Sequence, residues 1–355
     1  MLKADFYPYI LNFKEPGGTS RGVMTQRKVW YIYIYDEANP MVQGVGECAP
    51  LPGLSCDDMK KYEQILHDVC TNVSEYVSNL TLLTPFPSIR FGLEMAWLDY
   101  RHGGQRRWFP SDFTDGKDAI RINGLIWMGN KEMMIKRIRM KLRKGFSCLK
   151  LKIGAIHFDD EYQILKDLRR KFSSFDLELR VDANGAFKFD EALQRIDQLS
   201  KLHIHSIEQP IKAGQIEKMA AICCRASVPV ALDEEIIGIH TYQQRDELLS
   251  VIMPQYIILK PSLIGGFHSS DEWISLAEKY RVGWWITSAL ESNIGLNALA
   301  QWTYTKSSHM PQGLGTGQVF TNNMPSQLKL AGEYLYLNPN GKLRSELKYL
   351  QSAKR

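Results

Sequence analysis

The chain has 355 residues, a length typical of about two domains, and its hydrophobic content of 44% is enough for a sizeable core. Its formal net charge of +5 is small for this length, and apart from a basic end at 342–355 the cations are scattered, so nucleic acid is not an expected partner. No apolar run approaches the ~18 residues that a membrane span needs, and the first residues lack the apolar stretch of a secretory signal. We therefore expect a cytoplasmic protein with no membrane partner; the sequence does not indicate its oligomeric state.

The first 115 or so residues have the pattern of an α+β module. The expected elements are strands at 28–36 and 44–47 and helices at 57–78 and 88–101. Ser88 follows a Pro-Phe-Pro joint and is expected to cap the second helix at its N-terminus. A linker rich in Gly and Asp, at 103–118, ends this module.

Strand-like and helical segments alternate after this linker. The expected strands are 120–125, 149–154, 177–184, 203–210, 228–234, 256–261 and 284–288, and GLGTG at 313–317 marks an eighth. The expected helices are 132–144, 158–172, 190–202, 215–226, 241–249, 269–281 and 295–303. The rhythm is that of an α/β fold, a (β/α)₈-type (TIM-like) barrel, whose active site lies at the carboxyl ends of the strands. The strand-like YLYL at 334–337 is expected to return to the N-terminal sheet.

Two lysines stand on one face of the strand at 149–154 (LKLKIG). Side chains alternate along a strand, so Lys150 and Lys152 point the same way while the apolar residues point the other way. Two adjacent ammonium groups repel each other, and inside a barrel they need anionic partners. The following strands supply such partners at intervals of 25 to 30 residues.

Asp182, Glu208 and Asp233 end three successive strands. If they converge in a barrel, their mutual repulsion calls for a cation. An all-oxygen set without His or Cys suits a hard dication, so we expect Mg²⁺, with Mn²⁺ as a possible substitute.

Lys152, Lys150 and Lys260 are candidates for proton transfer at carbon. A lysine acts as a base when burial, a second lysine and a metal lower its pKa. Lys260 comes from the opposite side of the barrel, so the α-carbon of a substrate carboxylate is expected between Lys152 and Lys260. Each lysine taken singly has an alternative role in a structural salt bridge.

Two further polar residues lie on the face of Asp182. Asn184 is a candidate ligand for a substrate carboxylate, with a turn-capping role as the alternative. Arg180 lies one pleat deeper, where a substrate contact and a buried ion pair are equally good interpretations.

The motifs KLKIG, RVDANGAF, IEQP, LDEE and LKPSLIGG resemble, in order and spacing, the enolase superfamily and its muconate-lactonizing-enzyme-like subgroup. The resemblance covers nearly the whole chain. It implies an α+β capping domain (1–115), a modified barrel (116–318) and a C-terminal segment returning to the capping domain (319–355). It also implies Mg²⁺ on the three carboxylates, Lys152 and Lys260 as the acid/base pair, and Lys150 as an electrostatic helper.

The stretches 46–55 and 286–295, together with Arg180, are similar to the members of this subgroup that catalyse a syn dehydration in menaquinone synthesis. This resemblance implies that Lys152 removes an α-proton and returns it to the departing hydroxyl. Loops at 19–23 and 50–55 would close over a succinyl arm, with Ser288 as a candidate contact.

A different activity within the same subgroup is dipeptide epimerisation or N-succinylamino-acid racemisation. Dipeptide epimerases usually carry an Asp-x-Asp pair after the last barrel strand, and here 313–317 reads GLGTG. This departure argues against a cationic substrate but leaves an N-succinylamino acid open. A non-catalytic binding protein is disfavoured because the three carboxylates and both lysines are present.

Overall fold

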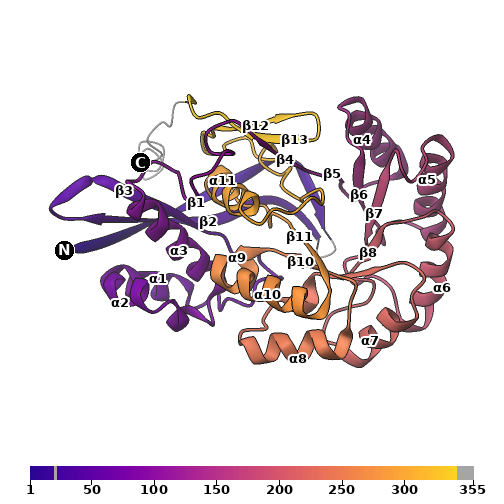
Figure 1. Cartoon of the computed structure of the whole chain (residues 1–355), viewed down its shortest axis with the longest axis horizontal. Coiled ribbons are helices and arrows are strands. Elements are labelled where there is room, and N and C mark those ends of the chain that lie inside the picture. The colour runs from indigo at the N-terminus through magenta and orange to yellow at the C-terminus, as the bar shows by residue number, and fades with distance from the viewer. Residues whose placement is uncertain (20–21, 342–355) are drawn as a thin grey trace.

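A computed structural model describes residues 1–19 and 22–341 of the chain. The basic end at 342–355 and part of the expected loop at 19–23 lie outside these residues. Figure 1 shows a three-stranded sheet with its helices at one end of the molecule and a set of alternating strands and helices at the other. No helix of the described residues is long and apolar enough to cross a membrane.

The N-terminal sheet is an antiparallel meander of β1 (Leu2–Thr19), β2 (Gly22–Asp36) and β3 (Asn39–Cys48). Both faces of β2 are buried: Trp30 and Ile32 pack toward the helices of this module, while Tyr31 packs into the main core of the molecule. A continuous apolar run therefore forms a central strand because the sheet lies between its own helices and the barrel. β1 is an additional strand that the sequence pattern did not predict.

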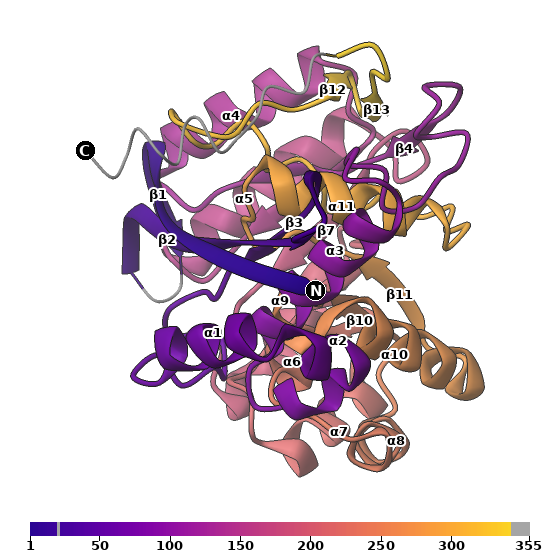
Figure 2. The ribbon, with the colours of Figure 1, turned by 90° about the vertical axis from the view of Figure 1, so that its left-hand side faces the viewer.

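Three helices cover the outer face of this sheet, as Figure 2 shows. They are α1 (Tyr62–Thr71), α2 (Val73–Ser78) and α3 (Pro87–Arg101), with a short 3-10 turn η1 (Leu80–Leu83) between the last two. The single helix expected at 57–78 is thus two helices that meet at Asn72. Ser88 is not the N-cap of α3, because Phe86 holds that position; the Ser88 hydroxyl is instead buried and donates to Asp57 Oδ1.

The barrel is a curled seven-stranded parallel sheet with strand order β11-β10-β9-β8-β7-β6-β5. Its strands are β5 (Gly124–Ile126), β6 (Cys148–Lys152), β7 (Glu178–Asp182), β8 (Ser206–Glu208), β9 (Val230–Leu232), β10 (Tyr256–Leu259) and β11 (Gly283–Ile286). Single bridges from Gln312 to Ile122 and from Gly313 to Thr287 join the two edges at the place expected for an eighth strand. The predicted TIM-type architecture with a preceding α+β module is confirmed.

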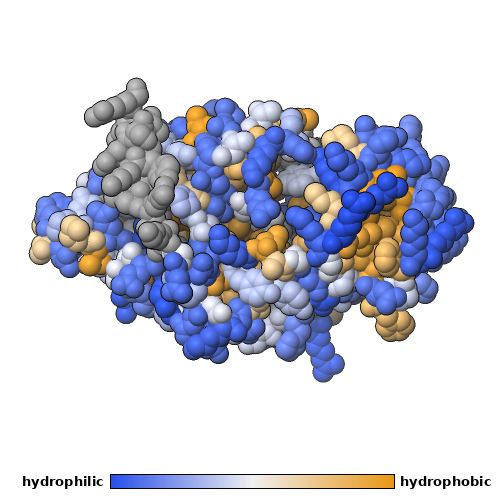
Figure 3. Space-filling model, turned by 90° about the horizontal axis from the view of Figure 1, so that it is seen from above, coloured by the Kyte–Doolittle hydropathy of each residue, from blue (hydrophilic) through white to orange (hydrophobic). Residues whose placement is uncertain are grey.

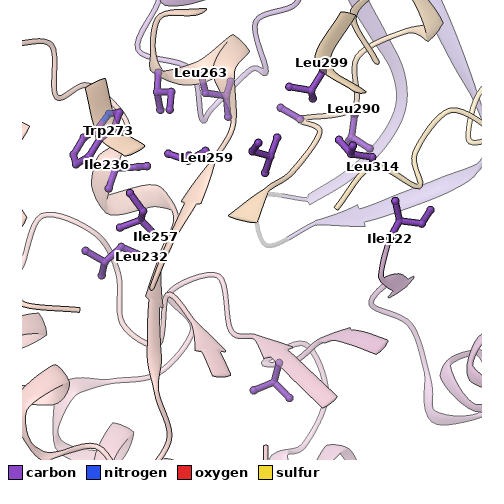
Figure 4. Close-up of a cluster of buried hydrophobic side chains, with 14 of the residues drawn as sticks. Ile122, Leu232, Ile236, Ile257, Leu259, Leu263, Trp273, Leu290, Leu299 and Leu314 are labelled. Atoms are coloured by element: carbon purple, nitrogen blue, oxygen red, sulfur yellow. The ribbon is translucent and has the colours of Figure 1, made fainter. Parts of the chain in front are cut away.

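The intervening helices surround this sheet (Figure 1). They are α4 (Lys131–Arg143), α5 (Phe158–Lys171), α6 (Phe189–Ser200), α7 (Ile216–Arg225), α8 (Tyr242–Ile252), α9 (Pro261–Ile264), α10 (Gly266–Tyr280) and α11 (Asn293–Tyr304), with a 3-10 turn η2 (Glu234–Ile236) after β9. Apolar side chains fill the space between sheet and helices. Figure 4 shows part of this core, in which Leu259 of β10, Leu263 of α9 and Trp273 of α10 lie close together.

The chain after the barrel runs differently from the expectation. The strand predicted to rejoin the N-terminal sheet is β13 (Tyr334–Leu337), but it pairs with β12 (Leu328–Ala331) and β4 (Ala119–Arg121). β4 and β5 replace the single strand expected at 120–125. A separate sheet forms here because the backbone groups of β4 face the returning chain instead of a barrel neighbour.

Contact with the N-terminal sheet comes from an earlier part of this segment. The backbone N–H of Lys14 donates to Val319 O at 2.8 Å, and that of Thr321 donates to Asn12 O at 2.8 Å. The Asn322 side chain accepts from Asn12 N at 2.8 Å. The proposed boundaries at 115 and 318 remain predictions.

Two buried carboxylates of the N-terminal module cap barrel helices. Glu94 of α3 accepts from the backbone N–H groups of Phe267 (2.6 Å) and His268 (3.0 Å) at the start of α10. Glu47 of β3 accepts from Ser292 N (2.7 Å) and Gly295 N (2.8 Å) at the start of α11. Free N–H groups and the helix dipole favour an anion at both positions, so these contacts fix the module against the barrel.

The surface is mostly hydrophilic, and the apolar side chains visible in Figure 3 gather toward the end of the molecule that carries α4 to α6.

We expect the stability of the protein to depend on pH through the buried capping residue Glu94. Burial raises the pKa of Glu94 from 4.5 to about 7, so the folded chain holds this proton over a pH range in which the unfolded chain has released it. The stabilisation that this bound proton contributes is complete below 4.5, the pKa of Glu94 in the unfolded chain, and is lost as pH rises through about 7, its pKa in the folded chain. The free energy of unfolding of the wild type should therefore fall more steeply between pH 4.5 and 7 than that of Glu94→Gln, as measured by denaturant titration. An exposed Glu217→Gln control should follow the wild type, and parallel curves for all three proteins would contradict the prediction.

Candidate active site

A cavity of about 460 Å³ opens at the carboxyl ends of the barrel strands. The N-terminal module contributes one wall, formed by residues 22–28 and by Leu51, Pro52 and Leu54. The barrel contributes the remaining lining: Asn123, Leu125, Trp127, Lys150, Lys152, Asn184, Glu234, Lys260, Thr287, Ser288, Ala289, Leu290, Gly313, Gly315 and Thr316. Both expected loop regions therefore reach this cavity in their described parts, and the GLGTG stretch forms part of its wall.

The strand register brings the predicted residues together. Lys152 of β6 lies opposite Asp182 of β7, and Asp182 lies opposite Glu208 of β8. The three side chains thus stand at one level on adjacent strands and on the same face. Asp233 follows β9 and Lys260 follows β10, so the ends of the next two strands continue this ring of charged side chains.

Buried ion pairs connect these groups. Lys150 Nζ lies 3.0 Å from Asp182 Oδ2 and 2.5 Å from Glu208 Oε2. Lys152 Nζ donates to Asp182 Oδ2 at 2.9 Å and to Asn184 Oδ1 at 2.7 Å. Across the ring, Lys260 donates to Asp233.

The electrostatics of this ring differ from one carboxylate to the next. Although burial opposes ionisation, the Lys150 and Lys152 ammonium groups hold the pKa of Asp182 well below its usual range. Burial, with the charge of Asp182, raises the pKa of Glu208 to about 8. Asp182 therefore stays ionised, whereas the neighbouring Glu208 ionises only at a higher pH than an ordinary glutamate.

Lys150 and Lys260 depart from the expected fall in pKa. Burial acts to lower the pKa of Lys150, but Asp182 and Glu208 outweigh it and raise the pKa above its ordinary value. The pKa of Lys260 is also raised, since Asp233 and Glu208 outweigh burial. In this arrangement the carboxylates hold the protons of both lysines in place.

The donor chemistry of the three carboxylates fits a hard cation. Glu208 Oε1 and Asp233 Oδ1 are buried and accept no hydrogen bond from any described residue, which is costly for carboxyl oxygens unless a cation takes them. No group of three or more His, Cys, Asp or Glu side chains in the described chain is already arranged around one point as a metal site. The lysine ammonium groups lie among the carboxylates and balance their charge.

Asn184 adopts a left-handed conformation (φ 44°) just after β7. Its Nδ2 donates to Glu234 Oε1 at 3.1 Å while its Oδ1 accepts from Lys152, so Asn184 links the lysine to a fourth acidic residue. Glu234 was not among the predicted site residues, although the LDEE motif places it next to Asp233. Its position in that motif is the signal that could have identified it.

Arg180 lies one pleat below Asp182, as expected, but does not line the cavity. Its Nε donates to Glu178 Oε1 at 2.6 Å, and its Nη1 donates to Pro311 O at 3.0 Å. The guanidinium also lies 4.3 Å from the centre of the Trp285 ring. These contacts are those of the structural alternative, and a substrate role stays a prediction.

Ser288 lines the cavity, but its hydroxyl is already engaged. Its Oγ donates to Glu291 Oε2 at 2.6 Å and accepts from Leu290 N (3.1 Å) and Thr316 Oγ1 (2.7 Å). A contact between this hydroxyl and the substrate therefore stays a prediction that requires one of these bonds to be exchanged.

Arg27 is a second residue that sequence reasoning did not single out. It is only 2% exposed, and its guanidinium donates to the carbonyl groups of Ala49 and Ala289. It thus joins the loop after β3 to the loop after β11, and both loops line the cavity. Arg27 lies within β2, beside its apolar run, and an arginine at such a position carries no local signal of this role.

Two family models and a curated relative match this chain. Residues 133–327 match the family model "Enolase C-terminal domain-like", and residues 1–100 match "MenC, N-terminal domain". The o-succinylbenzoate synthase of Desulfotalea psychrophila is 45% identical over 92% of this chain and 96% of its own.

Solved structures show the same relationship. The crystal structure of MenC from Desulfotalea psychrophila superposes with a TM-score of 0.83 at 42% identity, covering 95% of this chain and 99% of that chain. The L-Ala-D/L-Glu epimerase of Bacillus subtilis has a TM-score of 0.81 at 20% identity, covering 94% and 95% of the two chains, and shares the fold. The chain belongs to the o-succinylbenzoate synthase family of the enolase superfamily.

Proposed function

We propose that this chain dehydrates 2-succinyl-6-hydroxy-2,4-cyclohexadiene-1-carboxylate to 2-succinylbenzoate in menaquinone biosynthesis, as a hydro-lyase acting by syn β-elimination. The observation that carries the proposal is that Lys152, Asp182 and Glu208 lie side by side at the ends of adjacent strands. They lie at the base of a cavity that is lined by both the N-terminal module and the barrel. The 45% identity to a curated o-succinylbenzoate synthase supports this activity over others in the superfamily.

Lys152 is the proposed base. Its Nζ reaches the cavity, and Asp182 and Asn184 orient it through hydrogen bonds. The unprotonated amine takes the α-proton, and the electron pair of that C–H bond moves into the substrate carboxylate, which becomes an enediolate. This electron pair then forms the new C=C bond as the C–O bond breaks. The ammonium then returns the proton to the departing hydroxyl, which leaves as water, so the lysine ends as it began.

Lys150 and Lys260 stabilise the negative charge that develops on the substrate carboxylate. Lys150 is buried beneath Lys152 and keeps its positive charge because two carboxylates hold its proton. Lys260 lines the same cavity from the other side of the ring. Preorganised cations in a pocket with little water are worth more than the same charges in solvent.

A divalent metal belongs to the chemistry of this superfamily, and we propose Mg²⁺, with Mn²⁺ as a possible substitute, on Asp182, Glu208 and Asp233. Such an ion would supply Lewis-acid stabilisation of the substrate carboxylate as its negative charge increases. Its positive charge beside the carboxylates would also weaken the hold of these carboxylates on the lysine protons. The residues that orient the carboxylates therefore influence both the metal and the base.

Racemisation of N-succinylamino acids is a second candidate, because Lys152 and Lys260 both line the cavity and lie at the ends of different strands. A racemase needs a proton donor and an acceptor on opposite faces of one carbon. Dipeptide epimerisation has less support, since the GLGTG wall at 313–317 offers no acidic pair for an amino group.

Lys152→Ala should lower kcat for the dehydration by about 10²- to 10⁴-fold, because the general base is lost. Turnover can be followed by absorbance, and circular dichroism should show an unchanged fold. Lys171→Ala, which removes an exposed lysine at the end of α5, is the control and should retain activity. Wild-type-like turnover by Lys152→Ala would refute the assignment of the base.

Removing divalent metal with a chelator should abolish the dehydration, and added Mg²⁺ should restore it, because the carboxylate set needs a cation to act on the substrate. Initial rates before and after dialysis measure the effect. Full activity in metal-free buffer would contradict the proposed cofactor.

Incubation in D₂O with N-succinylamino acids separates the two candidate functions. For a dehydratase we expect rapid turnover of the cyclohexadiene substrate, whatever exchange occurs at the amino-acid α-carbon. NMR showing fast α-deuterium incorporation with inversion, and no dehydration, would favour the racemase instead.

A further inference from the structure

Gln209 lies directly after Glu208 at the end of β8 and has no part in the proposed chemistry. Its side chain is fully buried. Its backbone is in the left-handed region (φ 39°), which residues other than glycine adopt at a cost. A buried polar side chain on a strained backbone persists only where the surrounding contacts hold it there.

The amide of Gln209 spans the segment that follows β9. Its Oε1 accepts from the backbone N–H groups of Asp233 (3.1 Å) and Glu235 (3.2 Å). Its Nε2 donates to Ile211 O and to Glu235 Oε2, both at 3.0 Å. Both N–H groups and both lone pairs of the amide are used, so it has one orientation.

The backbone of Gln209 makes matching contacts on either side. Its carbonyl accepts from Gly185 N at 2.7 Å, in the loop that follows Asp182, and its N–H donates to Ala231 O at 2.9 Å, in β9. One residue therefore bonds to the chain beyond Asp182, is covalently joined to Glu208, and bonds to the backbone of Asp233.

We propose that Gln209 is a positioning residue that sets the spacing of the three carboxylates, and that it thereby controls the affinity of the site for a divalent cation. This inference rests on the metal site of the proposed function. The left-handed backbone turns the amide toward β9, and the four hydrogen bonds offset the strain. A glutamine that only stabilised the barrel would affect folding and leave cation binding unchanged.

The experiment measures Mn²⁺ binding to the full chain without substrate, by the loss of free Mn²⁺ signal in electron paramagnetic resonance. Gln209→Met keeps length and neutrality but removes all four hydrogen bonds. We expect its Kd for Mn²⁺ to rise about 10- to 100-fold, as for other groups that orient metal ligands. An unchanged Kd would overturn the proposal.

A matched control is Gln301→Ala. Gln301 is also fully buried, and its amide makes three hydrogen bonds, to Arg106, Asn297 and Phe109, away from the cavity. This variant should lose thermal stability and keep the Mn²⁺ affinity of the wild type. If Gln209→Met showed the same pattern, Gln209 would have only a structural role.

Gln209→Asn keeps the proposal testable if the methionine variant does not fold. Asparagine tolerates the left-handed backbone better than glutamine, and this gain partly offsets the hydrogen bonds that the shorter side chain loses. Its amide is one methylene shorter and cannot reach Asp233 N and Ile211 O together. We expect weaker Mn²⁺ binding by a folded protein, with folding checked by circular dichroism, and wild-type affinity would overturn the proposal.

Asp182→Asn distinguishes this inference from the proposed function. If the wild type binds Mn²⁺ no better than Asp182→Asn, the carboxylate site itself is wrong and the inference fails with it. If Asp182→Asn abolishes binding while the Gln209 variants bind like the wild type, the site stands and only the role of Gln209 is refuted.

Discussion

The pairing of buried lysines with buried carboxylates is the interaction on which the rest of this structure depends. Four acidic groups (Asp182, Glu208, Asp233 and Glu234) and three lysines (Lys150, Lys152 and Lys260) lie at the carboxyl ends of adjacent barrel strands. Neither set could be buried alone, because unpaired charges in a protein interior cost several kcal/mol each. Parallel strands in one register bring the two sets to the same level, so the fold itself provides the charge balance.

The same arrangement explains why the N-terminal module matters to a site built on the barrel. The strand ends carry the reactive groups, but the loops beyond them form the walls of the cavity. Glu94 and Glu47 hold the N-termini of α10 and α11, the helices that follow the Lys260 and Ser288 strands. Arg27 joins loops from both parts of the chain. The cavity therefore depends on the fit between the two parts, and a change in that fit alters the walls without touching the lysines.

Most of the barrel could be predicted because its signals are local. Alternation along 149–154 placed Lys150 and Lys152 on one face, and the spacing of Asp182, Glu208 and Asp233 indicated successive strand ends. These predictions depend only on strand geometry and on the length of one strand–helix unit. The prediction of one helix at 57–78 was wrong because the helix is interrupted at Asn72. The prediction of Ser88 as an N-cap was wrong because its hydroxyl donates a buried hydrogen bond to Asp57.

The sequence by itself determined the fold class, the strand that carries the lysines, and the carboxylates that face them, since each follows from patterns within about thirty residues. Only the tertiary structure decided which residues hold these groups in place. Glu47 meets α11 across 245 positions and Glu94 meets α10 across 173, and such long-range contacts leave no periodic mark in the sequence. The pairing of β13 with β4, the stacking of Arg180 on Trp285 and the bonds from Gln209 to the Asp233 segment were decided in the same way. In each case a polar group takes the nearest partner that the folded chain provides.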